Sequence, residues 1–284
     1  MLTEVKAGPY TIRGVSVGGV YTSLCVPELD VLFDVGIAAR SSVGVEHVLI
    51  SHGHADHIGA LPSLMGVRGL NRKGSPRVFL PAEIVGDVRT ALVALSRIQR
   101  FDLEPELVGV RPGEVHALHG DLHARVFKTY HPVPSVGYQL FRKVRKLKPE
   151  LLSLSGAEVA RRRASGDEDA LFDWAERLEL AYATDTLIEV IDREPSLTKS
   201  RVLVLECTFL DERKAKAHSR SRCHVHLDEI LERADSFENE HIVLMHFSQF
   251  YSPDEVRRLL AARCPPRLLE RIVSFAPPRG PWPG

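Results

Sequence analysis

Histidine and acidic residues are concentrated in one short segment, SHGHADHIG, within the first quarter of the sequence. It supplies three imidazoles and one carboxylate within six residues: His52, His54, Asp56 and His57. Imidazole nitrogen and carboxylate oxygen are the donors that bind a catalytic zinc ion. An apolar run, HVLISH, precedes the motif and a helical pattern follows it, which is a strand-then-helix setting. The segment therefore predicts a metal site rather than a histidine-rich surface loop.

Three further ligand-type residues stand where other predicted strands end. His131 closes HARVFKTYH, Asp185 closes LAYATD and His246 closes HIVLMH. Proteins of the α/β class place their sites at the carboxyl ends of strands. Taken singly, each residue is more readily explained as a hydrogen-bonded structural group. Together with the histidine segment, they indicate one shared site.

Strands and helices alternate along the chain, and they have to position these side chains. Apolar runs such as VLFDVG and RVLVLECTF predict strands. Helical spacing of apolar residues predicts helices over 84–100 and 228–236, and PDEVRRLLAAR predicts another that starts with proline. We expect one α/β domain of sheet and helix layers that spans residues 1–284.

Residues from about 142 to 180 differ from their surroundings and read as an insertion between two strands. The segment opens with RKVRKLK and continues into a short helical pattern, LSGAEVARRR. Cations arranged to neutralise phosphates supply most non-specific affinity for nucleic acid. A basic run can also be an ordinary solvated face, and the sequence leaves both interpretations open.

Composition excludes several classes of protein. The 284 residues carry 37 basic and 37 acidic side chains, so a uniformly basic nucleic-acid coat is ruled out. No stretch approaches the ~18 apolar residues of a membrane span, and no secretory signal is visible at the N-terminus. The four cysteines are scattered, which argues against a disulfide framework and favours a reducing, cytoplasmic location.

The order of these motifs resembles the metallo-β-lactamase superfamily, and within it the tRNA 3′-processing endonucleases called RNase Z or tRNase Z. The segment SHGHADHIGALP followed by a distant histidine, an aspartate and a final histidine carries the superfamily resemblance. The stretches FKTYHPVPSVGYQL, LECTFLDERKAKA and HVHLDEI carry the narrower one. KLKPELLSLSGAEV and HVHLDEI are most similar to the short plant-type enzymes. The resemblance implies a four-layer αββα fold.

The same resemblance implies roles for individual residues. One zinc ion would be held by His52, His54 and His131, and a second by Asp56, His57 and His246, with Asp185 bridging them. Asp56 would also take part in catalysis, Glu206 and His224 would form the proton donor, and Asp34 would orient a ligand histidine. Arg142, Lys143, Arg145 and Lys146 would contact tRNA from the insertion. On the sequence alone, Asp34 is equally consistent with a turn-forming residue before Gly36.

We therefore expect a zinc-dependent endoribonuclease that removes the 3′ trailer of precursor tRNA. Two zinc ions per chain are expected, although Mn²⁺ or Fe²⁺ would suit the same donors. The family resemblance further implies a homodimer, while the cysteines and the lack of an apolar span predict a cytoplasmic location with no membrane association. One alternative is a hydrolase of the same fold that acts on a small ester, thioester or cyclic phosphodiester. A second alternative, a non-catalytic RNA-binding relative, has no need of seven metal ligands.

Overall fold

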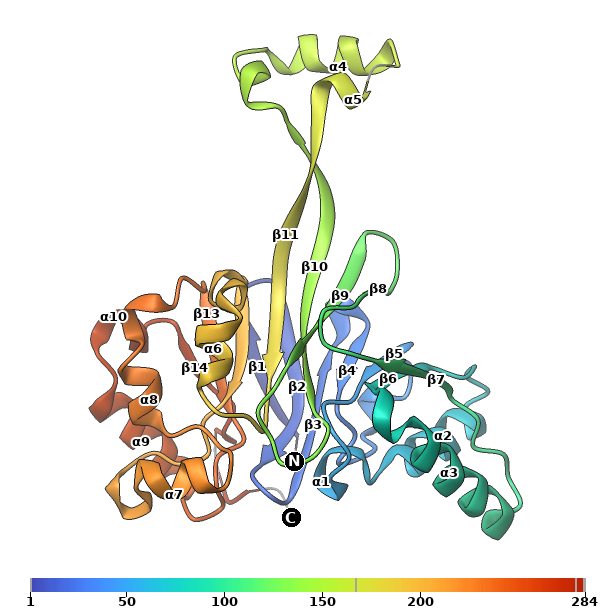
Figure 1. Ribbon diagram of the computed structural model, residues 1–284, viewed down its shortest axis with the longest axis vertical. Coiled ribbons are helices and arrows are strands. Elements are labelled where there is room, and N and C mark those ends of the chain that lie inside the picture. Colours follow the sequence, from blue (N-terminus) through green and yellow to red (C-terminus); the bar gives the residue numbers. More distant parts are fainter. Residues whose placement is uncertain (1, 167, 279, 283–284) are drawn as a thin grey trace.

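The computed structural model describes residues 2–166, 168–278 and 280–282, and within them two seven-stranded sheets pack face to face (Figure 1). The first sheet follows chain order: β1 (Thr3–Ala7), β2 (Tyr10–Val17), β3 (Tyr21–Val26), β4 (Val31–Phe33), β5 (His47–Leu49), β6 (Arg77–Pro81) and β7 (Glu106–Val110). The second sheet has the order β14 (Ile272–Ser274), β13 (His241–Met245), β12 (Val202–Glu206), β11 (Phe172–Ala183), β10 (Val136–Leu147), β9 (Leu122–Lys128) and β8 (Val115–Ala117).

Helices cover the outer face of each sheet (Figure 1). The first sheet is covered by α1 (Ala55–Ile58), α2 (Leu61–Leu70) and α3 (Val85–Gln99). The second is covered by α6 (Glu189–Arg193), α7 (Lys216–Ser221), α8 (Leu227–Leu231), α9 (Pro253–Arg263) and α10 (Pro266–Leu269). Buried apolar side chains form one layer between the sheets and a further layer under each set of helices. The expected four-layer αββα fold is therefore confirmed.

One expected helix is wrong in extent. The pattern over 228–236 predicts a single helix, but α8 ends at Leu231 and a separate 3₁₀ turn follows over Ala234–Ser236. The chain turns here because Phe237, which adopts an extended backbone, is buried in the apolar layer beneath the helices. By contrast, α3 and α9 occupy the ranges that their patterns predict.

The segment from about 142 to 180 is an arm that continues two neighbouring strands out of the second sheet (Figure 1). Strand β9 pairs with β10 only as far as Arg142, and β12 pairs with β11 only from Leu180 inward. Beyond these residues the two strands form a twisted ribbon that ends in α4 (Gly156–Ala164) and α5 (Glu168–Leu171). The helix expected from LSGAEVARRR is α4, which begins with a capping box between Ser155 and Glu158.

The arm and the carboxyl ends of the parallel strands lie at opposite ends of the second sheet (Figure 1). Strand β11 runs from the arm to Ala183, two residues before Asp185. The same strand therefore connects the arm with the edge of the sheet at which the predicted ligands gather.

Candidate metal centre

The histidine segment is held in place by close packing of two loops. His52 lies three residues after β5, and α1 begins at Ala55, so the segment fills the turn between strand and helix. The Val35 amide donates to the carbonyl of His57 at 2.6 Å. At Gly36, a Cβ atom would lie 2.1 Å from the carbonyl oxygen of Asp56. Glycine is therefore required at Gly36 for the two loops to approach each other.

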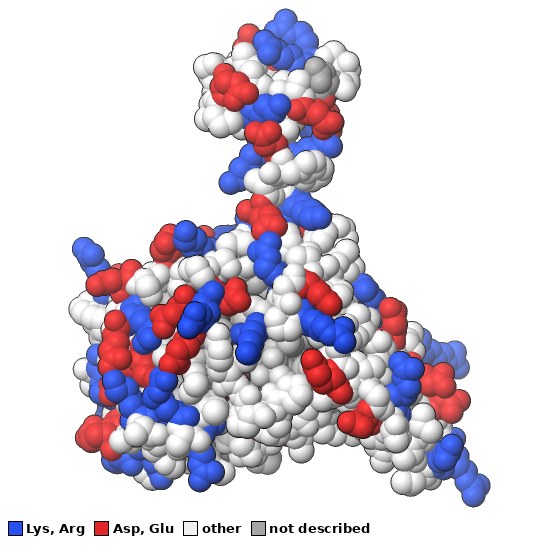
Figure 2. All heavy atoms as spheres, viewed as in Figure 1, with Lys and Arg blue, Asp and Glu red and all other residues white. Residues whose placement is uncertain are grey.

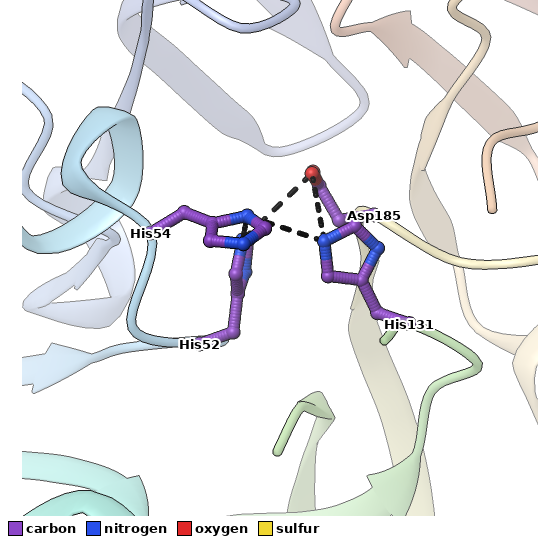
Figure 3. A group of neighbouring side chains, drawn as sticks. All are labelled: His52, His54, His131 and Asp185. Atoms are coloured by element: carbon purple, nitrogen blue, oxygen red, sulfur yellow. Dashed lines mark hydrogen bonds and ion pairs between the residues drawn. The ribbon is translucent and has the colours of Figure 1, made fainter. Parts of the chain in front are cut away.

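Four of the predicted ligands form one group (Figure 3). The imidazole nitrogens of His52 and His131 lie 3.0 and 3.2 Å from Nδ1 of His54. Both nitrogens also lie 3.8 Å from Oδ2 of Asp185. Three imidazoles and a carboxylate whose donor atoms converge at this spacing can bind a metal ion.

Asp56, His57 and His246 form a second group beside the first. His57 Nε2 lies 3.5 Å from a carboxylate oxygen of Asp56. The Nε2 atoms of His57 and His246 both lie 3.3 Å from Oδ1 of Asp185. The two oxygens of Asp185 therefore face one group each.

Unpartnered atoms support metal binding by this cluster. Among the described residues, the buried Nε2 atoms of His57 and His246 have no hydrogen-bond partner. A buried polar atom without a partner costs about 1–3 kcal/mol, and a metal ion would satisfy both atoms. The residues present therefore fit a bound metal.

Backbone conformation is unusual at this site. Asp34, Asp185 and His246 adopt positive φ angles of 54°, 45° and 59°. Few non-glycine residues adopt the left-handed region, and those that do cluster at functional sites. Each of these residues directly follows or lies close to the end of a strand. The positive φ turns its side chain toward the centre instead of continuing the strand.

Asp34 lies behind the predicted ligands and fixes the orientation of His57. It is fully buried, and His57 Nδ1 donates to its Oδ2 at 2.8 Å. The Ser51 amide and hydroxyl donate to the same carboxylate, at 2.7 and 2.8 Å, and the Tyr182 hydroxyl donates at 2.6 Å. Ser51 Oγ also lies 3.0 Å from His52 Nδ1. A proton on each Nδ1 leaves Nε2 of both histidines free for metal.

Sequence reasoning missed Ser51 and Tyr182. Each is next to, or a few residues from, a predicted ligand, but nothing in its residue type distinguishes it from a core residue. Tyr182 also stacks on Phe33, with ring centroids 4.5 Å apart. Its position beside Asp34 follows from the packing of the two sheets, which the sequence pattern does not specify.

Electrostatics within the cluster are strongly coupled. Burial disfavours the charged form of His57, but the carboxylates of Asp185 and Asp34 outweigh this effect and raise its pKa to about 9. Burial, reinforced by His57, lowers the pKa of His52. Burial also opposes ionisation of Asp185, yet the surrounding histidines lower its pKa well below the usual range. A metal must therefore displace a proton from His57, so its affinity should rise with pH.

Glu206 and His224 lie together beside the metal cluster. Glu206 is fully buried and accepts hydrogen bonds from the Thr186 amide at 2.6 Å and the Val225 amide at 3.2 Å. His224 Nδ1 lies 3.1 Å from its Oε2. Burial lowers the pKa of His224, but Glu206 outweighs burial and raises it to about 9. The His224 ring centroid is 5.3 Å from that of His246, so this pair borders the second ligand group.

Thr208 connects the Glu206–His224 pair to a predicted ligand, and sequence reasoning missed it too. Its hydroxyl donates to Glu206 Oε2 at 2.7 Å and lies 3.1 Å from His246 Nδ1. With the proton on Nδ1 of His246, that nitrogen donates to Thr208 and its Nε2 faces the metal site. The threonine of LECTF therefore fixes a ligand tautomer, a role that only the fold reveals.

The four residues predicted to contact RNA lie on β10 in the arm, away from the metal cluster (Figure 1). Arg142 pairs with Asp121, and Arg145 pairs with Glu168 while lying 4.8 Å from the ring of Trp174. Lys143 and Lys146 are exposed and have no ion-pair partner among the described residues. Basic and acidic side chains alternate along the arm (Figure 2).

Comparison with known proteins places this fold and site in a class. A model of the beta-lactamase superfamily domain matches residues 30–247. The metallo-beta-lactamase fold protein YhfI of Bacillus subtilis superposes with a TM-score of 0.57 at 14% identity, covering 92% of each chain. The chain belongs to the beta-lactamase superfamily.

More similar relatives identify the family. The chain is 35% identical to tRNase Z TRZ1 of Arabidopsis thaliana over 94% of this chain and 95% of that protein. It is 33% identical to the chloroplastic tRNase Z TRZ2 of the same plant, over 89% of this chain and 72% of that protein. The short form of human tRNase Z shares the fold, with a TM-score of 0.56 at 15% identity over 83% of this chain and 92% of that chain. The chain belongs to the tRNase Z family, as the motifs predict.

Proposed function

We propose that this protein is a metal-dependent endoribonuclease that removes the 3′ trailer from precursor tRNA. The observation that carries the proposal is the pair of adjacent ligand groups, which share Asp185, in a chain 35% identical to a plant tRNase Z over 94% of its length. Hydrolysis would leave a 3′-hydroxyl on the tRNA and a 5′-phosphate on the trailer.

Two zinc ions per chain would occupy the cluster. His52, His54 and His131 would hold one ion, Asp56, His57 and His246 the other, and Asp185 both. When bound, such ions activate a water molecule and stabilise the charge that develops on the phosphate. The donor set of imidazole and carboxylate suits zinc, and manganese or iron would also fit it.

His224 would donate the proton that the leaving 3′-oxygen needs. Its Nδ1 faces Glu206, so Nε2 is the atom left to reach a substrate. Glu206 is fixed by two backbone amides and by Thr208, and it raises the pKa of His224 to about 9 against the effect of burial. His224 therefore carries a proton at neutral pH, and Glu206 positions it.

The arm would grip the body of the tRNA through its phosphates. Lys143 and Lys146 are exposed on β10 and have no ion-pair partner among the described residues. Arg161 and Arg162 on α4 are also exposed and, within the described part of the chain, have no ion-pair partner. Such cations can neutralise phosphates directly. Arg142 and Arg145 are paired with carboxylates and contribute less.

A homodimer is also proposed, with the outer face of α2 and α3 as the contact. Leu70 is 83% exposed and Phe101 is 44% exposed. A groove of about 530 Å³ lies beside Leu70 and Phe101. Apolar side chains gathered on one face indicate an interaction surface. Leu70→Lys should give a monomer in light scattering, whereas Leu152→Lys on the arm should not.

We place the protein in the cytoplasm. The four cysteines form no disulfide, and three of them are buried, which suits a reducing compartment. Among the described residues, no helix combines the length and the apolar character needed to span a membrane.

The proposal is tested by giving purified, metal-loaded protein three substrates side by side: trailer-bearing precursor tRNA, mature tRNA and an aryl phosphodiester. Cleavage of the precursor at the trailer junction is expected. Hydrolysis of the aryl compound with no cleavage of the precursor would contradict the proposal and favour a small-molecule hydrolase.

A further inference from the structure

A buried carboxylate lies where the arm leaves the second sheet. Leu180 pairs with Leu140, whereas Leu178 pairs with Phe141, so the intervening Glu179 has no partner on β10 and forms a bulge. Bulges bend a strand and increase its twist. Glu179 is only 1% exposed, and it is the first buried residue of β11 after the exposed arm.

Four side chains from separate segments converge on Glu179. The Tyr10 hydroxyl donates to it at 2.5 Å, and Arg177 Nε donates at 2.6 Å. Arg142 lies 3.6 Å from its Oε1, and Arg201 lies 4.0 Å from its Oε2. Burial, reinforced by Glu179, raises the pKa of Tyr10, so its hydroxyl remains a donor. We refer to Tyr10, Arg142, Arg177, Glu179 and Arg201 as the root cluster.

The root cluster joins the arm to both sheets. Tyr10 begins β2 in the first sheet, whereas Arg201 precedes β12 in the second. Arg142 and Arg177 face each other across the two arm strands. The strand pairing of β10 with β9 and of β11 with β12 ends at the same level.

The guanidinium groups of the cluster are committed to protein carboxylates. Arg142 also pairs with Asp121, and Arg201 also pairs with Glu240. They are therefore poorly placed to serve as a phosphate site. Burying a carboxylate costs several kcal/mol unless it is paired, and an apolar residue would often serve stability as well. The gain in stability therefore does not explain a buried ionic cluster at this bulge, whereas a role in fixing the local backbone geometry does.

We propose that the root cluster fixes the direction in which the arm leaves the fold, with Glu179 as the positioning residue. About seven residues of strand separate Glu179 from the end of the ribbon, or roughly 23 Å. A change of about 10° at the root would move that end by about 4 Å over this length of strand. The consequence for substrate rests on the proposed function, because only a tRNA that spans arm and metal centre would detect such a shift.

The test compares Glu179→Gln with Glu176→Gln. Both variants make the same chemical change on β11, but Glu176 is an exposed carboxylate three residues further out, and its partner is Arg125 of β9. Tyr10→Phe is a second, milder variant of the cluster. Hydrogen–deuterium exchange is measured over residues 139–147 and 172–180 without RNA. Steady-state kinetics are then measured on precursor tRNA and on an aryl phosphodiester.

For Glu179→Gln and Tyr10→Phe we expect exchange at the root to accelerate by about fivefold or more, with β12 and β13 unchanged. The KM for precursor tRNA should rise by about 5–10-fold with little change in kcat or in aryl phosphodiester turnover. Glu176→Gln should neither accelerate exchange at the root nor raise the KM for precursor tRNA. Root exchange that stays at the wild-type rate in both cluster variants would overturn the inference. Faster root exchange with unaltered tRNA kinetics would uphold it and contradict the tRNA-gripping role of the arm instead.

Discussion

The metal centre and the arm are built at opposite ends of the same two strands, and they use charge in opposite ways. His131 precedes β10 and Asp185 follows β11, whereas the far ends of both strands form the arm. At the metal end, Asp34, Asp185 and Glu206 are nearly or fully buried, and each accepts from or faces several donors. In the outer part of the arm, beyond Glu179, charged side chains are largely exposed and form few ion pairs, as Glu176 does with Arg125 and Glu168 does with Arg145 and Arg163.

This difference in burial predicts where a single substitution should have a large effect. A buried charge must be matched by fixed partners, and removing one partner leaves the others uncompensated. An exposed ion pair contributes little, typically ~0–1 kcal/mol. We therefore expect a single substitution at the metal end to have a large effect. On the arm we expect each substitution to have a small effect, so that several are needed for a large one.

The largest effect is expected at Asp185, whose two oxygens face different ligand groups. Asp185→Asn keeps the size of the side chain but removes its charge. At least one of two metals should be lost, and with it several kcal/mol of transition-state stabilisation, or roughly 10⁴-fold in turnover on RNA and on an aryl phosphodiester. Metal analysis of the purified variant checks this result. Asp173→Asn on the same strand, in the exposed arm, is the control. Full metal content in Asp185→Asn would refute the bridging role.

His224→Ala should lower RNA cleavage by roughly 10²–10⁴-fold, the usual contribution of a general acid. Glu206→Ala should have an effect in the same range. Metal content should remain intact, because neither residue is a proposed ligand. An aryl phosphodiester, whose leaving group needs no proton, should be much less sensitive. Equal losses on both substrates would show that the pair supports the metal site rather than supplying a proton.

The pH–rate profile for RNA offers a second test of that pair. A general acid must be protonated, so activity should be retained below the raised pKa of His224, about 9, and lost as pH rises through it. Glu206→Gln removes the carboxylate that raises this pKa, so the alkaline limb should move to lower pH. Rates measured from pH 6 to 10 show the shift. An alkaline limb that does not move would show that ionisation of His224 does not set the pH dependence.

The clustering of the candidate ligands could be predicted from the sequence, because they are residue types suited to metal binding, at short spacing or at strand ends. Their assignment to two metals is an expectation from the family resemblance. Tyr182 and Thr208 could not be predicted, since their contacts join strands that are distant in sequence. The reach of the arm was also missed. The side chains of its ribbon are exposed or only partly buried, and RKVRKLK lacks the apolar alternation that marks a strand packed on a core.

A smaller effect is expected from the buried tyrosines near the site. Tyr182 donates to Asp34, whereas Tyr138 donates to the carbonyl of Ile50. Both are fully buried, so Tyr182→Phe and Tyr138→Phe remove equivalent hydroxyls. Loss of a group that bonds a metal ligand, as Asp34 bonds His57, typically costs 10–100-fold in affinity. Tyr182 acts one step further out, through Asp34, so we expect at most about 10-fold for Tyr182→Phe. Zinc competition with a chromogenic chelator measures it. Equal weakening by both variants would assign the loss to packing.

The smallest single effects are expected on the arm, where free and paired cations can be compared directly. Lys143 and Lys146 have no ion-pair partner among the described residues, whereas Arg142 and Arg145 are paired with carboxylates. A paired guanidinium must break its ion pair before it can neutralise a phosphate, so the lysines should contribute more to binding. Removing one cation that neutralises a phosphate lowers the slope of log affinity against log salt by about 0.7–0.9. Replacing both lysines by alanine should therefore flatten that slope by up to about 1.8 and weaken precursor tRNA binding several-fold. Replacing Arg145 by alanine, which leaves the root cluster intact, should have a smaller effect on the slope, and aryl phosphodiester turnover should not change in either variant. Filter binding between 50 and 200 mM salt resolves these differences. Slopes equal to that of the wild type in both variants would show that this side of the arm is an ordinary solvated face, because a surface that binds phosphate cannot be deprived of two cations without releasing fewer counterions.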